Sequence, residues 1–292
     1  MDYDKDVRST ARRAVRLALA EDLGREGDIT SNAVVPEDVN AVGLYEFKQD
    51  ATVAGVRVVE EVCRQVSREI QVGILKFDSD RMTTGDVAIR IEGPARCILA
   101  AERTSLNFFS HLCGVATLTR KYVEAVAGTE AQIFDTRKTT PGLRLLEKYA
   151  VRCGGGVNHR LGLYDQILVK DNHLAIMCAR CGEENLAAEL TRLRKDTAPE
   201  ILVEVEAGTL REVKAAAEGG VDIIMLDNMT VDAMREAVEL VKSRGGRPPI
   251  LEASGGVNLD TVAVIARTGV DRISVGALTH SAPAVDISLE IE

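Results

Sequence analysis

Basic side chains gather in one stretch of this acidic chain, whose formal net charge is -9. Any one of them is most simply explained by a local surface ion pair, but the whole group is not. Arginine forks bind carboxylate or phosphate oxygens in bidentate pairs, and lysine supplies a point charge. The group therefore predicts a small ligand with more than one negative charge, bound among Arg137, Lys138, Arg144, Lys148, Arg152, His159, Arg160 and Lys170.

Two acidic residues, Glu206 and Asp227, each end a strand-like run further along the chain. One interpretation is that they only neutralise the nearby cations, since ion-pair networks can mimic sites. The other is a magnesium site beside a sugar phosphate, because Mg²⁺ is commonly held by one or two carboxylates plus substrate phosphates. Carboxylates there would also stabilise positive charge on a sugar ring.

Glycine-bearing loops follow the last two strand-like runs. Ser254, Gly255 and Gly256 precede a helix that begins near Leu259, and Gly276 lies in "SVGALTH". Glycines let backbone N–H groups approach an anion closely, and barrels often bind phosphate on their last loops. A single Gly-Gly turn is usually only a turn, but two such loops favour a phosphate site.

Elements that would position these residues alternate regularly from residue 131 onward. Apolar strand-like runs with helical patterns between them predict a parallel sheet covered by helices. Every strand ends in a residue that could bind a ligand or take part in catalysis. This pattern favours a TIM-like barrel with its site on the C-terminal face over a doubly wound sheet. We expect an incomplete, six-stranded barrel from the runs at 131–136, 165–171, 200–206, 221–228, 249–254 and 271–277.

The first third of the chain predicts a small α+β layer. An amphipathic helix is expected over residues 7–23, a turn at "GDITS", and a long helix from Ala95 that is interrupted near Gly114. A second helix is expected over 57–68, among strands at 41–47, 51–55, 71–77 and 86–93.

Composition excludes several classes of protein. The pI of about 5.2 argues against a nucleic-acid binder. We see no secretory signal and no apolar run long enough to span a bilayer, so we expect a cytoplasmic protein with no membrane partner. The six cysteines are then reduced thiols, and the pair in "CARC" (Cys178 and Cys181) lacks the further ligands of a zinc site.

Taken together, these residues resemble the quinolinate phosphoribosyltransferase family, the type II phosphoribosyltransferases of NAD biosynthesis. The motifs follow the family's order over nearly the whole chain, and the long central one is highly specific. They are "EDLGREGDIT", "AERTSLNFFSHLCGVAT", "DTRKTTPGLRLLEKYAVRCGGGVNHRLGLYDQILVKDNH", "EVE", "MLDNM", "LEASGGV" and "SVGALTH".

The resemblance implies a homodimer and an enzyme that makes nicotinate mononucleotide from quinolinate and phosphoribosyl pyrophosphate, with Mg²⁺ as cofactor. It implies an N-terminal α/β sandwich over residues 1–113 and an open α/β barrel over 114–280. Residues 281–292 are then a C-terminal segment that returns to the first domain.

Roles for individual residues also come from the resemblance. Arg103 would complete the partner's site, and Lys138, Glu206 and Asp227 would be catalytic, the two acids also holding magnesium partly through the pyrophosphate. The implied substrate-binding residues are Arg103, Thr136, Arg137, Lys138, His159, Arg160 and Lys170, and the implied phosphate-binding residues are Ser254, Gly255, Gly256, Gly276, Ala277 and His280.

Other functions stay open on the sequence alone. Lys170 at a strand end also fits a Schiff-base aldolase. A metabolite sensor would need the cations but not the acids. A nicotinate-specific transferase or a paralogue with another acceptor would share the fold, although so many cations are excessive for one carboxylate.

Overall fold

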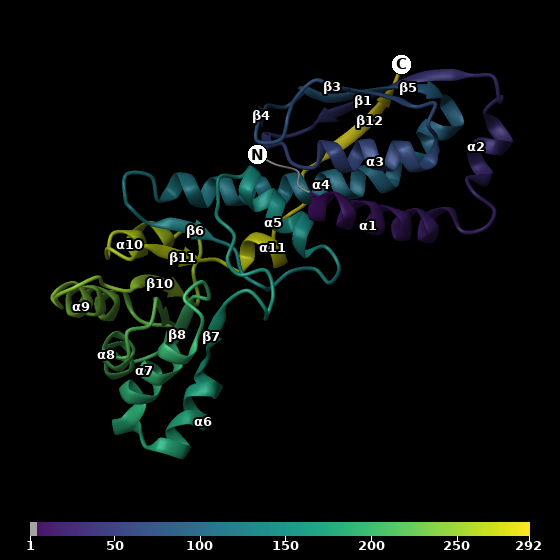
Figure 1. Cartoon of the computed structure of the whole chain (residues 1–292). Helices are drawn as coiled ribbons and strands as arrows, with labels where there is room; N and C mark the ends of the chain where they lie inside the picture. Colours follow the sequence, from purple (N-terminus) through teal and green to yellow (C-terminus); the bar gives the residue numbers. More distant parts are fainter. Residues whose placement is uncertain (1–4) are drawn as a thin grey trace. The chain divides into compact units, whose positions relative to one another are not determined.

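The computed structural model describes residues 5–292, which form two compact units (Figure 1). The first contains the described residues up to Arg120, with Lys138–Gly156 and Ala277–Glu292; the second contains Lys121–Arg137 and Val157–Gly276. Domain boundaries near residues 113 and 280 stay a prediction. None of the helices within residues 5–292 has the length and apolar character needed to cross a bilayer.

The first unit is built on a four-stranded antiparallel sheet. Along β1 (Asn40–Phe47), Gly43, Tyr45 and Phe47 are buried in alternation, as expected of a strand with one covered face. Phe109 of helix α4 (Ala95–Ala125) packs edge-on against Phe47, with ring centroids 5.6 Å apart, so the long helix covers this face. The strand order is β12 (Ile287–Ile291), β1 (Asn40–Phe47), β5 (Val87–Pro94) and β3 (Gln71–Ile74).

One strand expected in this sheet lies elsewhere. The run at 51–55 yields only β2 (Ala51–Thr52), which pairs with β4 (Arg81–Met82) in a separate ribbon. The chain cannot extend further because helix α3 (Val56–Val66) begins immediately afterwards. The fourth strand of the sheet is instead β12, from the C-terminus, which pairs antiparallel with β1.

Helix α1 (Lys5–Leu23) confirms the amphipathic helix, with Val7, Ala11, Val15 and Leu19 buried. The expected interruption near Gly114 is wrong, because α4 (Ala95–Ala125) is continuous. Gly114 is required there by close packing: a Cβ atom would lie 2.2 Å from the backbone oxygen of Pro283.

The expected turn at "GDITS" is also wrong. Residues Ile29–Val34 form helix α2, and the Asp28 side chain accepts a hydrogen bond from the backbone N–H of Ser31 at 2.9 Å. Asp28 is thus an N-cap residue, which satisfies an N–H group that the helix start leaves open. An Asp followed by a short polar run is as typical of a turn as of the start of a short helix.

The second unit confirms all six expected parallel strands. They form one sheet in which sequential strands are neighbours, except that β6 pairs with β11 and not with β7. The sheet is therefore a barrel that stays open between its first two strands. The strands are β6 (Gln132–Phe134), β7 (Ile167–Val169), β8 (Val203–Ala207), β9 (Ile223–Asp227), β10 (Ile250–Ser254) and β11 (Arg272–Ser274).

Helices follow most of these strands (Figure 1). The sequence did not predict α6 (Asp171–Cys181), which carries Cys178 and Cys181 one turn apart as free thiols. Its apolar residues form no clear stripe, and only Leu174 is buried. The other helices of the second unit are α7 (Leu186–Asp196), α8 (Leu210–Glu218), α9 (Val231–Lys242) and α10 (Val262–Ala266), and a 3₁₀ turn at Glu183–Asn185 precedes α7. Two further helices, α5 (Arg144–Cys153) and α11 (Ala277–His280), belong to the first unit.

Candidate active site

The C-terminal ends of the six strands meet at one edge of the second unit. Asp227 pairs with Ser254 in the parallel register of β9 and β10, and Glu206 pairs with Met225 between β8 and β9. The register therefore brings several predicted residues to a common edge. Those within the second unit are Thr136, Arg137, His159, Arg160, Lys170, Glu206, Asp227, Ser254, Gly255, Gly256 and Gly276.

Arg137 and Arg160 lie close enough to repel each other. Burial lowers the pKa of the Arg160 guanidinium, and the charge of Arg137 lowers it further. Only 8% of Arg160 is exposed, and its guanidinium donates to the carbonyl oxygen of Gln166 at 3.1 Å. Two like charges held together are stabilised by an anion that contacts both, so this pair is suited to a carboxylate or phosphate.

Lys170 and Glu206 form an ion pair at the ends of neighbouring strands. The Lys170 Nζ atom lies 3.1 Å from Oε1 of Glu206. The lysine side chain is 48% exposed, so the pair contributes little to stability and a substrate can replace either partner. Oε2 of Glu206 also lies 3.4 Å from the backbone nitrogen of Asp171, where α6 begins.

The loop after β10 packs against the end of β9. The Asn228 side chain donates to the Asp227 carboxylate at 2.8 Å, and its backbone N–H donates to the Ser254 carbonyl at 2.9 Å. Gly255 has a φ of +93°, and a Cβ atom there would lie 2.2 Å from Oδ1 of Asn228. Only glycine fits, which leaves the loop backbone open to an approaching anion.

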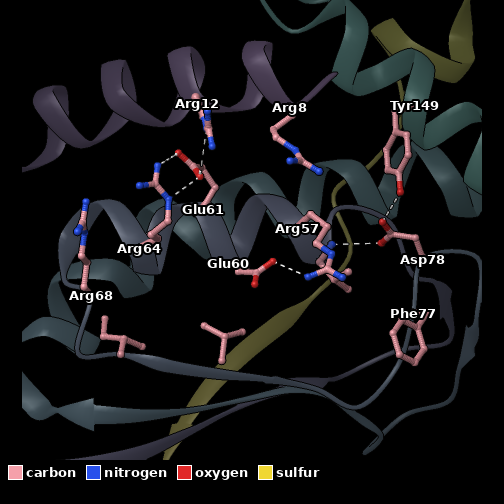
Figure 2. Close-up of a pocket in the computed structure, with 13 residues that line it drawn as sticks. Arg8, Arg12, Arg57, Glu60, Glu61, Arg64, Arg68, Phe77, Asp78 and Tyr149 are labelled. Carbon is pink, nitrogen blue, oxygen red and sulfur yellow. Dashed lines mark hydrogen bonds and ion pairs between the residues drawn. The ribbon is translucent and has the colours of Figure 1, made fainter. Parts of the chain in front are cut away.

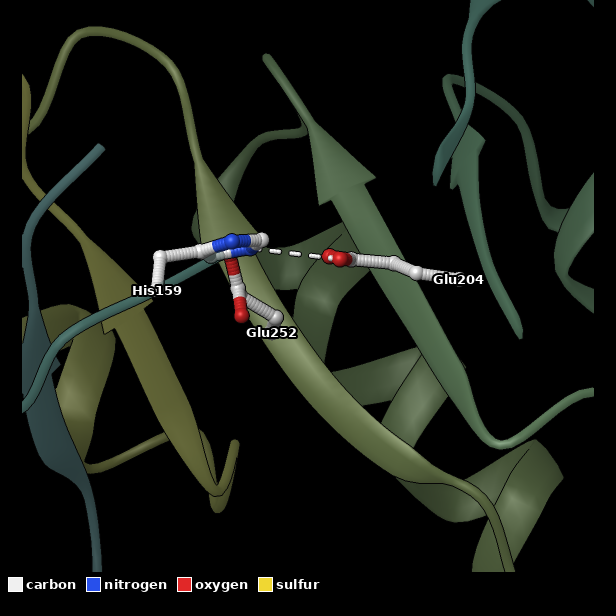
Figure 3. Close-up of side chains that lie close together, drawn as sticks. All are labelled: His159, Glu204 and Glu252. Atoms are coloured by element: carbon white, nitrogen blue, oxygen red, sulfur yellow. Dashed lines mark ion pairs between the residues drawn. The ribbon is translucent and has the colours of Figure 1, made fainter. Parts of the chain in front are cut away.

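His159 is held inside the barrel by two glutamates that the sequence analysis did not identify. Its Nε2 atom lies 3.2 Å from Oε2 of Glu204 and 3.3 Å from Oε1 of Glu252 (Figure 3). Both carboxylates are fully buried, on strands β8 and β10. Within residues 5–292, no other set of at least three His, Cys, Asp or Glu side chains clusters at metal-ligand distance.

Polar neighbours satisfy only one oxygen of each buried carboxylate. Gln166 donates to Glu204 at 2.5 Å and Ser274 donates to Glu252 at 2.5 Å, while Oε1 of Glu204 and Oε2 of Glu252 accept no hydrogen bond. A half-satisfied carboxylate in a dry interior can favour its protonated form. Burial accordingly raises the pKa of Glu204.

The cluster holds an additional proton at neutral pH. Burial lowers the pKa of His159, but the two carboxylates outweigh it and raise that pKa to about 10. The backbone N–H of Arg160 donates to Nδ1 of His159 at 2.8 Å, so Nε2 carries the ring proton that faces the glutamates. The additional proton is therefore shared within the coupled pair of His159 and Glu204, whose pKa values are both raised.

The segment that carries His159 and Arg160 is fixed beside β6. The Val157 N–H donates to the Ile133 carbonyl at 2.8 Å, and the His159 N–H donates to the buried Asp135 carboxylate at 2.8 Å. Asp135 also accepts from the Asn158 side chain at 2.6 Å. These bonds hold the segment at the open side of the barrel, and His159 anchors it from within. A direct contact between His159 and substrate stays a prediction.

Four predicted site residues belong to the first unit. Arg103 is exposed on α4, and its guanidinium makes no hydrogen bond or ion pair within residues 5–292. The Lys138 carbonyl accepts a hydrogen bond from the Thr279 hydroxyl at 2.7 Å, next to Ala277 and His280 in α11. The Lys138 and His280 side chains are exposed.

Comparison with known proteins agrees with this architecture. Residues 28–113 match the model of the quinolinate phosphoribosyl transferase N-terminal domain, and residues 115–290 match that of its C-terminal domain. The chain is 42% identical to the carboxylating nicotinate-nucleotide pyrophosphorylase of Mycobacterium leprae, over 96% of this chain and 97% of that protein.

Solved structures agree as well. The nicotinate-nucleotide pyrophosphorylase of Francisella tularensis superimposes with a TM-score of 0.88 at 37% identity, over 97% of this chain and 96% of that one. NadC from Streptococcus pyogenes gives 0.90 at 36% identity, over 100% and 99%. The chain belongs to the quinolinate phosphoribosyl transferase family.

Proposed function

We propose that this protein is a phosphoribosyltransferase that converts quinolinate and phosphoribosyl pyrophosphate into nicotinate mononucleotide, pyrophosphate and CO₂, a step of NAD biosynthesis. The names of relatives that match over nearly the full chain support this reaction. The single structural observation that carries it is the mutually repelling pair Arg137 and Arg160 at the edge where Glu206 and Asp227 end their strands.

Quinolinate recognition rests on the cations of that edge. The substrate carries two carboxylates on adjacent ring carbons, and the guanidinium groups of Arg137 and Arg160 can each bind one of them. Lys170 adds a third positive charge, which becomes available to the substrate when its ion pair with Glu206 opens. Each charge-assisted hydrogen bond to a desolvated carboxylate contributes roughly 1.5–3 kcal/mol, so the set favours a dianion over nicotinate.

Transfer of the phosphoribosyl group then proceeds at the anomeric carbon. The pyridine nitrogen of quinolinate forms a bond to that carbon while the bond to pyrophosphate breaks with its electron pair. Positive charge develops on the ribose ring, and the carboxylates of Glu206 and Asp227 stabilise it. The glycine loop after β10 binds the 5′-phosphate through its open backbone N–H groups.

Glu206 and Asp227 also fit a magnesium ion. They are half-buried carboxylates on neighbouring strands, a hard-oxygen donor set of the kind that magnesium accepts. When bound, the metal would neutralise charge on the leaving pyrophosphate. Lys138 contributes positive charge to the same pyrophosphate in this proposal.

Decarboxylation follows from the new charge on the pyridine. Once the ring nitrogen is bonded to ribose it is cationic, and it stabilises the electron pair that stays on C2 when the C2 carboxylate leaves as CO₂. The carbanion at C2 then takes up a proton. Arg137 and Arg160 keep the remaining carboxylate in place, so the same two residues bind the substrate and the product.

We also propose that the protein is a homodimer in which Arg103 of each chain completes its partner's site. Its exposed guanidinium, without a partner in its own chain within residues 5–292, supports this assignment. A cytoplasmic location is proposed as well, supported by six free cysteines, since thiols persist in reducing compartments.

The ion pair at Lys170 disfavours the aldolase alternative. A Schiff-base lysine must be a free amine in an apolar pocket, whereas this one is half-exposed and bound to Glu206. Borohydride treatment with a keto substrate tests the point directly. We expect mass spectrometry to find no adduct.

The test of the function is an incubation with magnesium, phosphoribosyl pyrophosphate and quinolinate. We expect nicotinate mononucleotide and pyrophosphate to form in equal amounts. The Lys170→Ala variant should lose most of this activity, and Arg267→Ala, an exposed residue without a partner in the described chain, should retain it. A wild-type protein that forms no nucleotide would refute the proposal.

A further inference from the structure

A cavity lies in the first unit of the described chain. It has a volume of about 990 Å³, which suits a metabolite-sized ligand. Its wall comes from α1, α3, β3 and the loop at Phe77 and Asp78, with Tyr149 of α5 at one end (Figure 2). None of its lining residues matches a position that the family resemblance places in the active site.

Arginines dominate this wall although the whole protein is acidic. Arg8 and Arg12 come from α1, Arg57 and Arg64 from α3, and Arg68 follows α3 (Figure 2). The acidic groups in the wall are Glu60, Glu61 and Asp78. Five cations therefore face three anions, a positive excess in a chain whose net charge is -9.

Those three acids are already occupied. Glu60 pairs with Arg57 at 2.7 Å, and Glu61 pairs with Arg64 at 2.5 Å. Asp78 accepts from the backbone nitrogens of Gly55 and Val56, at 2.7 and 3.1 Å, and so caps the start of α3. Its other oxygen accepts from the Tyr149 hydroxyl at 2.5 Å.

The remaining arginines face the cavity with unused donors. Arg12 reaches Glu61 only at 3.9 Å, and its side chain is 58% exposed. The guanidinium groups of Arg8 and Arg68 form no ion pair or hydrogen bond with any residue in the range 5–292. Guanidinium groups without carboxylate partners around one cavity are suited to bidentate contact with phosphate oxygens.

An apolar surface completes the cavity. Val56, Ile70 and Val72 line it, and the ring of Phe77 is 61% exposed at its rim. An exposed phenylalanine beside arginines provides a stacking platform for an aromatic base. The geometry points to a second ligand site that binds a nucleotide with two or more phosphates, its base on Phe77 and its phosphates on Arg8, Arg12 and Arg68.

Isothermal titration of the full-chain protein with ATP tests this site. We expect saturable binding of one ATP per chain, weakened about tenfold or more in Arg8→Ala and in Arg68→Ala. Arg25→Ala is the matched control, because Arg25 is exposed just beyond the end of α1 and does not line the cavity. Lys170→Ala tests whether ATP binds at the strand edge instead.

The outcomes separate this inference from the proposed function. Absence of saturable ATP binding overturns it, as does equal weakening by Arg25→Ala or a loss of binding confined to Lys170→Ala. Phe77→Ala should weaken ATP binding and leave the binding of inorganic pyrophosphate unchanged. If Phe77→Ala binds ATP as tightly as the wild type, the assignment to a nucleotide is wrong. None of these titrations depends on catalytic turnover.

Discussion

The Nε2 atom of His159 lies 3.2 Å from Oε2 of Glu204, deep between two strands of the barrel. Oε1 of Glu252 lies 3.3 Å from the same Nε2 atom. A histidine so enclosed serves first to hold its own segment in place, and Arg160 is the next residue along that segment. The buried cluster therefore sets the position of a predicted substrate-binding arginine.

Stability should fall as the pH rises from about 6.5 to 10. The pKa of His159 is raised from 6.5 to about 10, so its contribution is fully present below 6.5 and is lost as the pH passes through the raised value. We expect the free energy of unfolding in urea to drop by about 2 to 4 kcal/mol across this window. Glu252→Gln should reduce that drop.

The control for this experiment is Glu189→Gln, which removes a surface carboxylate paired with Arg180. It should keep the wild-type pH dependence. If Glu252→Gln and the wild type lose stability equally between pH 6.5 and 10, the buried cluster does not hold the additional proton.

Replacing Arg160 should weaken quinolinate binding. Arg160→Ala removes one of the two guanidinium groups that we propose bind quinolinate, so we expect KM for quinolinate to rise about tenfold to a hundredfold. KM for phosphoribosyl pyrophosphate should change much less. Steady-state kinetics with each substrate varied in turn separates the two, and equal increases would place Arg160 at the wrong substrate.

Neutralising Asp227 should slow the chemical step. Asp227→Asn keeps the size of the side chain but removes the charge that we propose stabilises the ribose ring, so kcat should fall by about a hundredfold or more. Asp232→Asn changes a carboxylate whose side chain is 86% exposed on α9 and should leave kcat unchanged. A normal kcat in Asp227→Asn would favour a sensor over an enzyme.

Mixing two inactive variants tests the proposed dimer. Arg103→Ala and Lys170→Ala damage different parts of a shared site, so a mixed dimer contains one intact site and one doubly damaged site. With random exchange of subunits, we expect about a quarter of wild-type activity. Activity that stays at the level of the separate variants would show that Arg103 acts within its own chain or not at all.

The barrel and its edge were predictable because each strand is a nearly continuous apolar run that ends in a polar residue. The parallel register then brings residues such as Asp227 and Ser254 together. The buried cluster was missed although it has a signal: Glu204 and Glu252 lie in the middle of apolar runs, where a charge requires a partner. Their partner, His159, is too distant in sequence for spacing to identify.

The first unit was harder to predict for physical reasons that differ from place to place. Strand β12 completes a sheet begun more than two hundred residues earlier, and no local pattern specifies such pairing. Gly114 indicates a helix break in sequence, but tertiary packing against Pro283 explains it. Asp28 caps a short helix whose composition is that of a turn.

The most direct test of the central claim measures the CO₂ released from the C2 carboxylate of quinolinate. Quinolinate labelled with ¹³C in its C2 carboxylate is incubated with magnesium and phosphoribosyl pyrophosphate, and released ¹³CO₂ is compared with pyrophosphate. We predict equal amounts of the two, and no pyrophosphate when nicotinate replaces quinolinate. A nucleotide that retains both carboxylates, or turnover of nicotinate as fast as that of quinolinate, would contradict the account.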